Sequence, residues 1–158
     1  GGWPQPRLQA TDLRACAESM LRFLEPSFAE AGVTARLTAA ARSGRPIAWT
    51  DPELTDQILL NLLKNAIEAL EPGGRITLST GREAGQAFLE IADDGPGLPA
   101  ETRNQLFQPF VTSKGAAGTG LGLAISRRLA RALGGELAYV PSDRGTRWRL
   151  TLPTPERS

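Results

Sequence analysis

The sequence predicts an α/β fold, built as a two-layer sandwich in which helices cover one face of a mixed sheet. Stretches with helical periodicity are interleaved along the chain with stretches that alternate between polar and apolar residues. Two pairs of alternating stretches are joined by short turns typical of hairpins. The 158 residues are enough for one hydrophobic core, so we expect a single compact domain.

The first half of the chain is expected to form two helices and two strands. Apolar residues recur at steps of three and four over 11–31, which predicts one amphipathic helix. Alternation predicts strands over 33–40 and 47–49. A helix over 52–71 should follow, because Asp51 is a favourable N-cap and proline is favourable at the first helical position.

The second half is expected to form two strand pairs and one helix. The alternating runs 75–82 and 86–92 are separated by a turn containing glycine, which predicts a hairpin. A helix over 121–133 begins after a run of glycines. The runs 135–140 and 146–152 close the chain as a second strand pair.

The segment 98–118 has no sustained periodicity beyond a possible short helix over 101–107. An irregular segment of this length inside a compact domain usually has a function, and a lid is the common one. Its two phenylalanines, Phe107 and Phe110, fit either a lid anchor or ordinary core packing.

The composition excludes several classes of chemistry. The chain contains no histidine and one cysteine, which excludes a Ser-His-Asp triad, a histidine-ligated metal, an internal disulfide and a cysteine zinc site within it. The net charge of +1 gives no sign of a nucleic-acid partner. No apolar run reaches the roughly 20 residues of a membrane helix, so we expect a cytoplasmic fragment without direct membrane contact.

Two asparagines on the predicted 52–71 helix are one turn apart, at Asn61 and Asn65. Asparagine is a mediocre helix former, so two of them in one apolar helix suggest a use outside it. A carboxamide oxygen is a neutral, hard ligand suited to Mg²⁺. The alternative is that both side chains simply face solvent.

The run Asp93–Gly97 follows a predicted strand directly. A carboxylate at a strand end can accept a hydrogen bond from an exocyclic base amine such as that of adenine. The neighbouring glycines allow the backbone to approach a ligand closely. The alternative is a plain turn, since Asp, Gly and Pro are the usual turn residues.

The glycine-rich run Gly118–Leu123 opens the predicted 121–133 helix. The unpaired N–H groups of a helix N-terminus can bind phosphate. The run is neither a Walker A loop nor a convincing dinucleotide fingerprint. Lys114, shortly before it, is either a mobile cation for a terminal phosphate or a solvated lysine.

In order and spacing these motifs resemble those of one family, the catalytic and ATP-binding domain of sensor histidine kinases, in the superfamily of gyrase, heat-shock chaperone and mismatch-repair ATPases. The resemblance covers roughly 11–153. The matching segments are Asn61–Ala66 (N box), Asp93–Gly97 (first glycine box), Phe107–Lys114 (F box), Gly118–Leu123 (second glycine box) and the late Gly145-Thr146.

The resemblance implies the Bergerat fold, with about five strands, three helices and a lid, and it implies ATP and Mg²⁺ as cofactors. Asn65 would contact the metal, and Asp93 would recognise the adenine amine. The catalytic residues would be Asn61, Asn65 and Lys114. The residues implied to contact the nucleotide are Asn61, Lys64, Asn65, Asp93, Gly95, Gly97, Thr112, Ser113, Lys114, Gly118, Thr119, Gly120, Leu121, Gly122 and Thr146.

The resemblance also implies partners and boundaries. The phosphoryl acceptor in such kinases is a histidine on a dimerising helical hairpin of the same protein. This histidine then passes the phosphoryl group to the receiver domain of a response regulator. We expect 1–10 to be a linker from that hairpin, 11–153 the catalytic domain and 154–158 a tail. A fragment without the hairpin should be a monomer and unable to phosphorylate itself.

Two positions bear on activity. Superfamily members that hydrolyse ATP commonly carry Glu where Asn61 stands, and an amide cannot act as a general base, so slow hydrolysis and phosphoryl transfer are expected. Many relatives carry Lys where Glu68 stands, and Lys114 is the candidate substitute. The alternatives are a nucleotide- or second-messenger-sensing module without kinase activity, an anti-sigma-type Ser/Thr kinase, and a simple ATPase.

Overall fold

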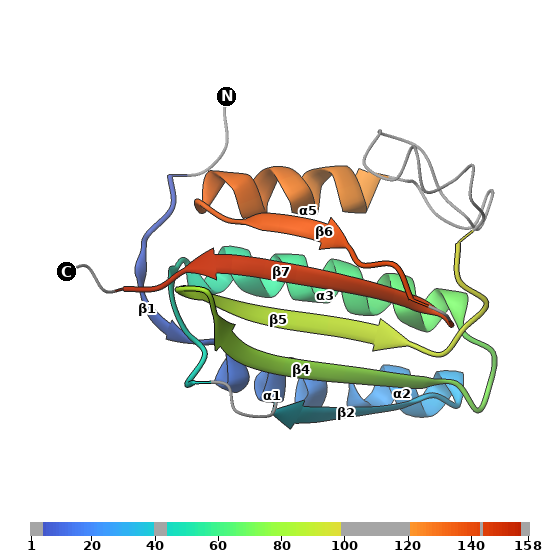
Figure 1. Cartoon of the computed structure of the whole chain (residues 1–158). Coiled ribbons are helices and arrows are strands. Elements are labelled where there is room, and N and C mark those ends of the chain that lie inside the picture. The colour runs from blue at the N-terminus through green and yellow to red at the C-terminus, as the bar shows by residue number, and fades with distance from the viewer. Residues whose placement is uncertain (1–4, 40–43, 99–120, 143, 156–158) are drawn as a thin grey trace.

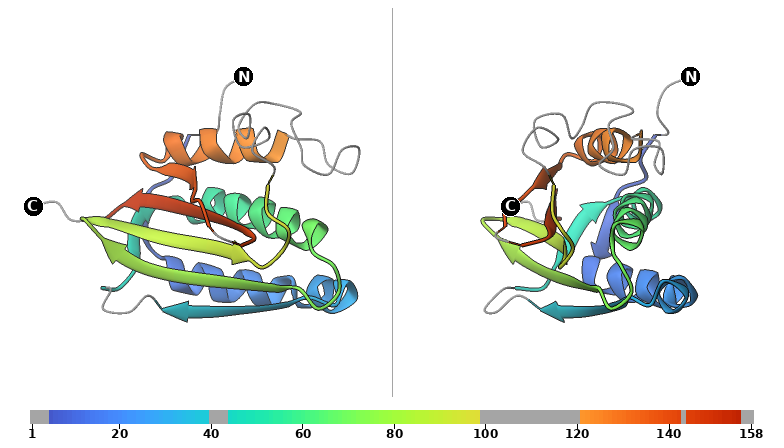
Figure 2. Two further views of the ribbon diagram at one scale, coloured as in Figure 1. Left: turned by 45° about the vertical axis from the view of Figure 1, so that its right-hand side comes forward. Right: turned by 90° about the vertical axis from the view of Figure 1, so that its right-hand side faces the viewer.

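The computed structural model describes residues 5–39, 44–98, 121–142 and 144–155. Within these residues, four helices lie on one face of a five-stranded mixed sheet, and a separate two-stranded ribbon lies at one end (Figure 1). The end-on view in Figure 2 shows the sheet as one layer and the helices as the other. The predicted fold class is confirmed. None of the described helices has the combination of length and apolar character that a membrane span needs.

The two-stranded ribbon pairs β1 (Gln9–Asp12) with β3 (Ile47–Thr50) in antiparallel register. The strand β1 was not predicted, and its first two residues belong to the segment 1–10 that we expected to be a linker. The inner face of the ribbon carries Thr11, Ala48 and Thr50, all of which are buried. Burial of this face is what keeps a strand of four residues in place.

The helix predicted over 11–31 is wrong as a single helix. It is divided into α1 (Leu13–Phe23) and α2 (Glu25–Ala31), with Leu24 between them. The reason is Pro26, which has no N–H to donate to a carbonyl one turn earlier and is favourable in the first turn of a new helix. The described residues therefore form four helices, one more than the three that the resemblance implied.

The helix α3 (Pro52–Ala69) begins where the sequence predicted. The carboxylate of Asp51, the N-cap, accepts hydrogen bonds from the N–H groups of Glu53 (2.9 Å), Leu54 (3.1 Å) and Arg7 (2.8 Å). It thus caps the helix and also anchors the chain that leads into β1. The buried face of α3 consists of Leu54, Thr55, Ile58, Leu59, Leu62, Leu63 and Ala66.

The main sheet has the strand order β2-β4-β5-β7-β6. Only β2 and β4 are parallel, and the other three pairings are antiparallel, including both predicted hairpin pairs. The strands are β2 (Thr34–Ala39), β4 (Arg75–Glu83), β5 (Gln86–Asp93), β6 (Glu136–Tyr139) and β7 (Thr146–Pro153).

Alternate residues of the central strands point toward the helices and form the core. Those that are almost fully buried are Ile76, Leu78, Leu89, Ile91, Leu150 and Leu152. The other face carries charged groups, and the guanidinium of Arg149 stacks 4.2 Å from the ring centre of Phe88. It also pairs with Glu90 at 2.6 Å, so this face is closed by cation–π and ionic contacts rather than by a second layer.

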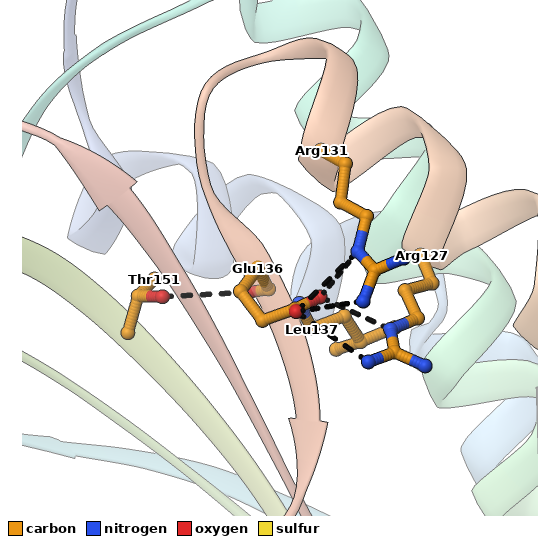
Figure 3. A network of polar contacts seen from close by, with 5 residues as sticks. All are labelled: Arg127, Arg131, Glu136, Leu137 and Thr151. Atoms are coloured by element: carbon orange, nitrogen blue, oxygen red, sulfur yellow. Dashed lines mark hydrogen bonds and ion pairs between the residues drawn. The ribbon is translucent and has the colours of Figure 1, made fainter.

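The helix α5 (Leu121–Ala132) runs antiparallel to α3 (Figure 1). Its second half is joined to β6 through Glu136, whose carboxylate pairs with Arg127 at 3.1 Å and Arg131 at 3.1 Å (Figure 3). Burial opposes the ionisation of Glu136, but the two guanidinium groups outweigh it and lower the pKa of Glu136 to about 2. The pair network therefore stays charged at neutral pH and holds α5 against the sheet.

We predict that Asp51→Ala lowers the free energy of unfolding by about 2 kcal/mol, because three N–H groups lose their acceptor. Asp12→Ala, the matched control, should cost about 1 kcal/mol, since the Asp12 carboxylate caps α1 through the N–H of Arg14. Urea unfolding at pH 7 measures both losses, and a larger loss for Asp12→Ala would contradict the assignment.

The loss of stability in Asp51→Ala should depend on pH. Burial opposes the ionisation of Asp51, but the N–H donors of Arg7, Leu54 and Glu53 outweigh it and lower the pKa of Asp51. The stabilisation is therefore complete above the unfolded-state pKa of about 4 and is lost as the pH falls through the lower folded-state value. The difference in the free energy of unfolding between Asp51→Ala and the unaltered chain should narrow only in that acidic range.

Candidate functional site

Several of the motifs singled out in the sequence meet at one end of the molecule. There the C-terminal ends of α3 and β5 lie beside the N-terminal ends of α5 and β7 (Figure 1). Segments far apart along the chain meet there, as the contact between Asn61 and Ser126, 65 residues apart, shows. The fold thus brings a carboxylate, two amides and several glycines into one region.

Asp93 is the last residue of β5 and lies opposite Thr146, the first residue of β7. Its Oδ1 accepts hydrogen bonds from the N–H of Gly95 at 2.9 Å and from the N–H of Thr146 at 3.3 Å. Two backbone donors on one oxygen fix the orientation of the carboxylate. The structure therefore places Thr146 against Asp93, although the two are 53 residues apart.

Glycines allow two backbone segments to come together beside Asp93. Gly145 has a φ of +71°, and a Cβ built on it would overlap the carbonyl oxygen of Asp93. Gly97 has a φ of +82°, and its Cβ would lie 3.1 Å from the carbonyl oxygen of Gly145. Both positions therefore require glycine.

The loop after β5 is also held from its other side. Asp94 exchanges two hydrogen bonds with Arg75 at the start of β4, one to its carboxylate at 2.8 Å and one from its N–H at 3.2 Å. A Cβ on Gly95 would lie 3.0 Å from Cδ2 of Leu70, at the end of α3. These contacts place the predicted first glycine box between the start of β4 and the end of α3.

The two amides of α3 face different surroundings. Nδ2 of Asn61 donates a hydrogen bond to Oγ of Ser126 in α5, at 3.2 Å. Asn65, one turn toward the C-terminus, is half-buried, and Lys64 between them is exposed. Asn61 is thus not a plain solvent-facing residue. Sequence reasoning did not identify Ser126, and the only available signal was a hydroxyl one turn after Gly122 on an otherwise apolar helix face.

Six of the predicted nucleotide contacts, and residues 99–118 of the segment predicted to be a lid, lie outside the described residues. The six are Thr112, Ser113, Lys114, Gly118, Thr119 and Gly120. Leu121 is the first residue of α5, and Gly122 lies in its first turn, where a Cβ would be 3.9 Å from Cγ of Asn61.

The donor set at this end suits one kind of metal binding. Among the described residues, no group of three or more His, Cys, Asp and Glu side chains is arranged to hold an ion. The amide oxygens of Asn61 and Asn65 are neutral donors, suited to a metal that completes its coordination with water and ligand phosphates. Mg²⁺ in nucleotide sites has this type of coordination, with few protein ligands.

The one cysteine is not a candidate nucleophile. Burial, together with the nearby carboxylates of Asp56 and Asp12, raises the pKa of Cys16 to about 11. The thiol is therefore neutral at pH 7, and only the thiolate is strongly nucleophilic. Cys16 packs against the hydrophobic core, which is a structural role.

Comparisons with known proteins point to one family. The profile of the family described as histidine kinase-, DNA gyrase B-, and HSP90-like ATPase matches residues 50–156. Nitrogen regulation protein NtrY of Azorhizobium caulinodans is 44% identical over 111 residues, which cover 65% of this chain and 14% of NtrY. Sensory histidine kinase/phosphatase NtrB of Salmonella typhimurium is 38% identical over 115 residues, which cover 65% of this chain and 32% of NtrB.

A solved structure shows the same fold over almost the whole chain. Full-length ShkA, in complex with AMPPNP, superimposes with a TM-score of 0.83 at 26% identity, covering 97% of this chain and 32% of ShkA. The chain therefore spans no more than about a third of these three proteins.

We predict that Gly145→Ala lowers the free energy of unfolding by more than about 3 kcal/mol, because the new methyl group meets backbone that has no room to move. Gly85→Ala is the matched control, since Gly85 has a φ of +77° with nothing within 4 Å of its Cβ. It should cost only the left-handed penalty of about 1 kcal/mol. Equal losses in urea unfolding would contradict the close approach at Gly145.

Proposed function

The chain belongs to the family of histidine kinase-, DNA gyrase B- and HSP90-like ATPases, and on that basis we propose that it is the ATP-binding catalytic part of a sensor histidine kinase. In this proposal it binds MgATP and transfers the γ-phosphoryl group to a histidine on a separate dimerisation domain. The catalytic domain is taken as residues 11–153, together with the first residues of β1.

The observation that carries the proposal is the fixed carboxylate of Asp93 at the same end of the fold as the α3 amides. A carboxylate oriented by backbone N–H groups of Gly95 and Thr146 is a suitable acceptor for the exocyclic amine of adenine. Gly97 and Gly145 allow the backbone segments beside it to pack closely, which holds the Asp93 carboxylate in place for a base.

The phosphate end of the nucleotide would lie toward α3 and the start of α5. Asn65 and Asn61 would hold the magnesium ion together with the phosphates, and Lys64 adds positive charge nearby. The first N–H groups of α5, at Leu121 and Gly122, suit phosphate oxygens. Mg²⁺, when bound, neutralises negative charge on the phosphates.

The chain's own residues would act by positioning. An imidazole nitrogen of the acceptor attacks the γ-phosphorus, a P–N bond forms, the bond to the β–γ bridging oxygen breaks, and ADP leaves with that electron pair. The chain contains no histidine, so the acceptor must come from another segment or another polypeptide. The phosphohistidine would then donate to the receiver domain of a response regulator.

The proposal is tested by supplying a histidine-bearing dimerisation hairpin as a separate polypeptide with labelled ATP and Mg²⁺. We expect labelling of the hairpin only when the chain is present, with a phosphoryl bond that is labile in acid. An acid-stable phosphoprotein would support a Ser/Thr kinase instead. ATP binding without any labelling would support a sensing module, and the absence of ATP binding would refute the proposal.

We predict that Asp93→Asn weakens ATP binding about 10- to 100-fold. An amide at this position keeps an oxygen for the two N–H groups but turns an NH₂ donor toward the adenine amine. Asp94→Asn is the matched control, since the Asp94 carboxylate bonds to Arg75, and it should change affinity less than about twofold. Calorimetric titration measures both, and equal effects would contradict the role of Asp93.

We predict that Asn61→Glu raises ATP hydrolysis by about tenfold or more, because a carboxylate can act as general base toward water and an amide cannot. Phosphate release measured without an acceptor polypeptide checks this. Asn61→Gln, which lengthens the side chain by the same methylene without adding a base, is the control and should not raise turnover. Unchanged hydrolysis in Asn61→Glu would contradict the placement of Asn61 near the γ-phosphate.

A further inference from the structure

The amide of Asn61 is held by a buried hydroxyl that no motif includes. Ser126 lies in the middle of α5, is fully buried, and accepts a hydrogen bond from Nδ2 of Asn61 at 3.2 Å. Its neighbours on the buried side of α5 are apolar, among them Leu129 and Ala130. A polar group in such a place requires a partner, and across the helix interface Asn61 provides one.

This hydrogen bond determines which way the amide of Asn61 points. A carboxamide has one donor end and one acceptor end. A serine hydroxyl within a helix can give its proton to the carbonyl one turn earlier, and its oxygen then remains as an acceptor. With Nδ2 bound to Ser126, Oδ1 of Asn61 points to the opposite side of the side chain.

The preceding turn of α5 also lies against the Asn61 amide. Gly122 lies four residues before Ser126 and therefore on the same face of the helix. A Cβ there would be 3.9 Å from Cγ of Asn61, an ordinary van der Waals distance, so Gly122 lies directly beside the amide group. Towards Asn61, α5 thus presents a hydrogen-bond acceptor at Ser126 and no side chain at Gly122.

We propose that Ser126 is a positioning residue for the nucleotide reaction: by accepting the N–H of Asn61 it presents Oδ1 of Asn61 to the metal and phosphate end of the nucleotide. This inference rests on the proposed function. It assigns to Ser126 a contribution through Asn61 and no contact with the nucleotide itself.

The central test compares Ser126→Ala with a control that loses a buried hydroxyl elsewhere. Thr55 provides it, because its hydroxyl pairs with that of Thr50 at 3.0 Å, at the opposite end of α3. We expect Ser126→Ala to weaken MgATP affinity about 5- to 20-fold while changing adenosine affinity less than twofold. Thr55→Val should change neither affinity more than twofold, even though it lowers thermal stability.

Two further measurements separate positioning from packing. In an Asn61→Ala background, Ser126→Ala should have no additional effect on MgATP affinity, whereas independent effects would multiply. Ser126→Thr, which keeps the hydroxyl, should recover most of the affinity. Multiplying effects, or an equal loss of adenosine and MgATP binding in Ser126→Ala, would overturn the proposal.

The orientation of the amide can be checked without any nucleotide. In nuclear magnetic resonance spectra of the free chain, the side-chain NH₂ of Asn61 should exchange slowly with water, and Ser126→Ala should speed that exchange about tenfold. No change in exchange would overturn the inference while leaving the proposed function intact. Failure of the unaltered chain to bind MgATP, with the exchange difference present, would instead refute the proposed function.

Discussion

The antiparallel register of β5 and β7 is the constraint on which the candidate site depends. It places Asp93 opposite Thr146, so that one carboxylate oxygen receives N–H groups from both the following loop and the neighbouring strand. A shift of one residue would turn every side chain of β7 to the other face and would remove Thr146 from Asp93. The same register brings Gly145 against the backbone of Asp93, where only glycine fits.

One face of α3 packs in the core, and another face carries residues of the candidate site. Ile58, Leu59, Leu62 and Leu63 are buried against the sheet and the other helices, while Asn61 reaches α5. The second half of α5 is in turn held by Glu136, which pairs with Arg127 and Arg131 (Figure 3). Core packing and an ionic contact together therefore hold the two helices whose polar residues meet.

In the proposed function, the chemistry divides between this chain and a partner that carries the histidine. The chain has two amides and a fixed carboxylate at one end of the fold, but it has no histidine and its single thiol is held neutral by burial and nearby carboxylates. Such a set suits phosphoryl transfer, in which positioning and charge compensation do most of the work, and it leaves the nucleophile to another segment or molecule.

Features set by neighbouring residues could be predicted from the sequence: the start of α3 at Asp51 and Pro52, and the β4-β5 hairpin. Pro26 is a local signal for the break between α1 and α2, but the apolar periodicity on both sides of it predicts one continuous helix. The pairing of β1 with β3, the contact of Thr146 with Asp93 and the hydrogen bond from Asn61 to Ser126 were decided only by the tertiary structure. Each joins residues tens of positions apart, and local propensity carries no information about which distant partner the assembled sheet and helices will bring into reach.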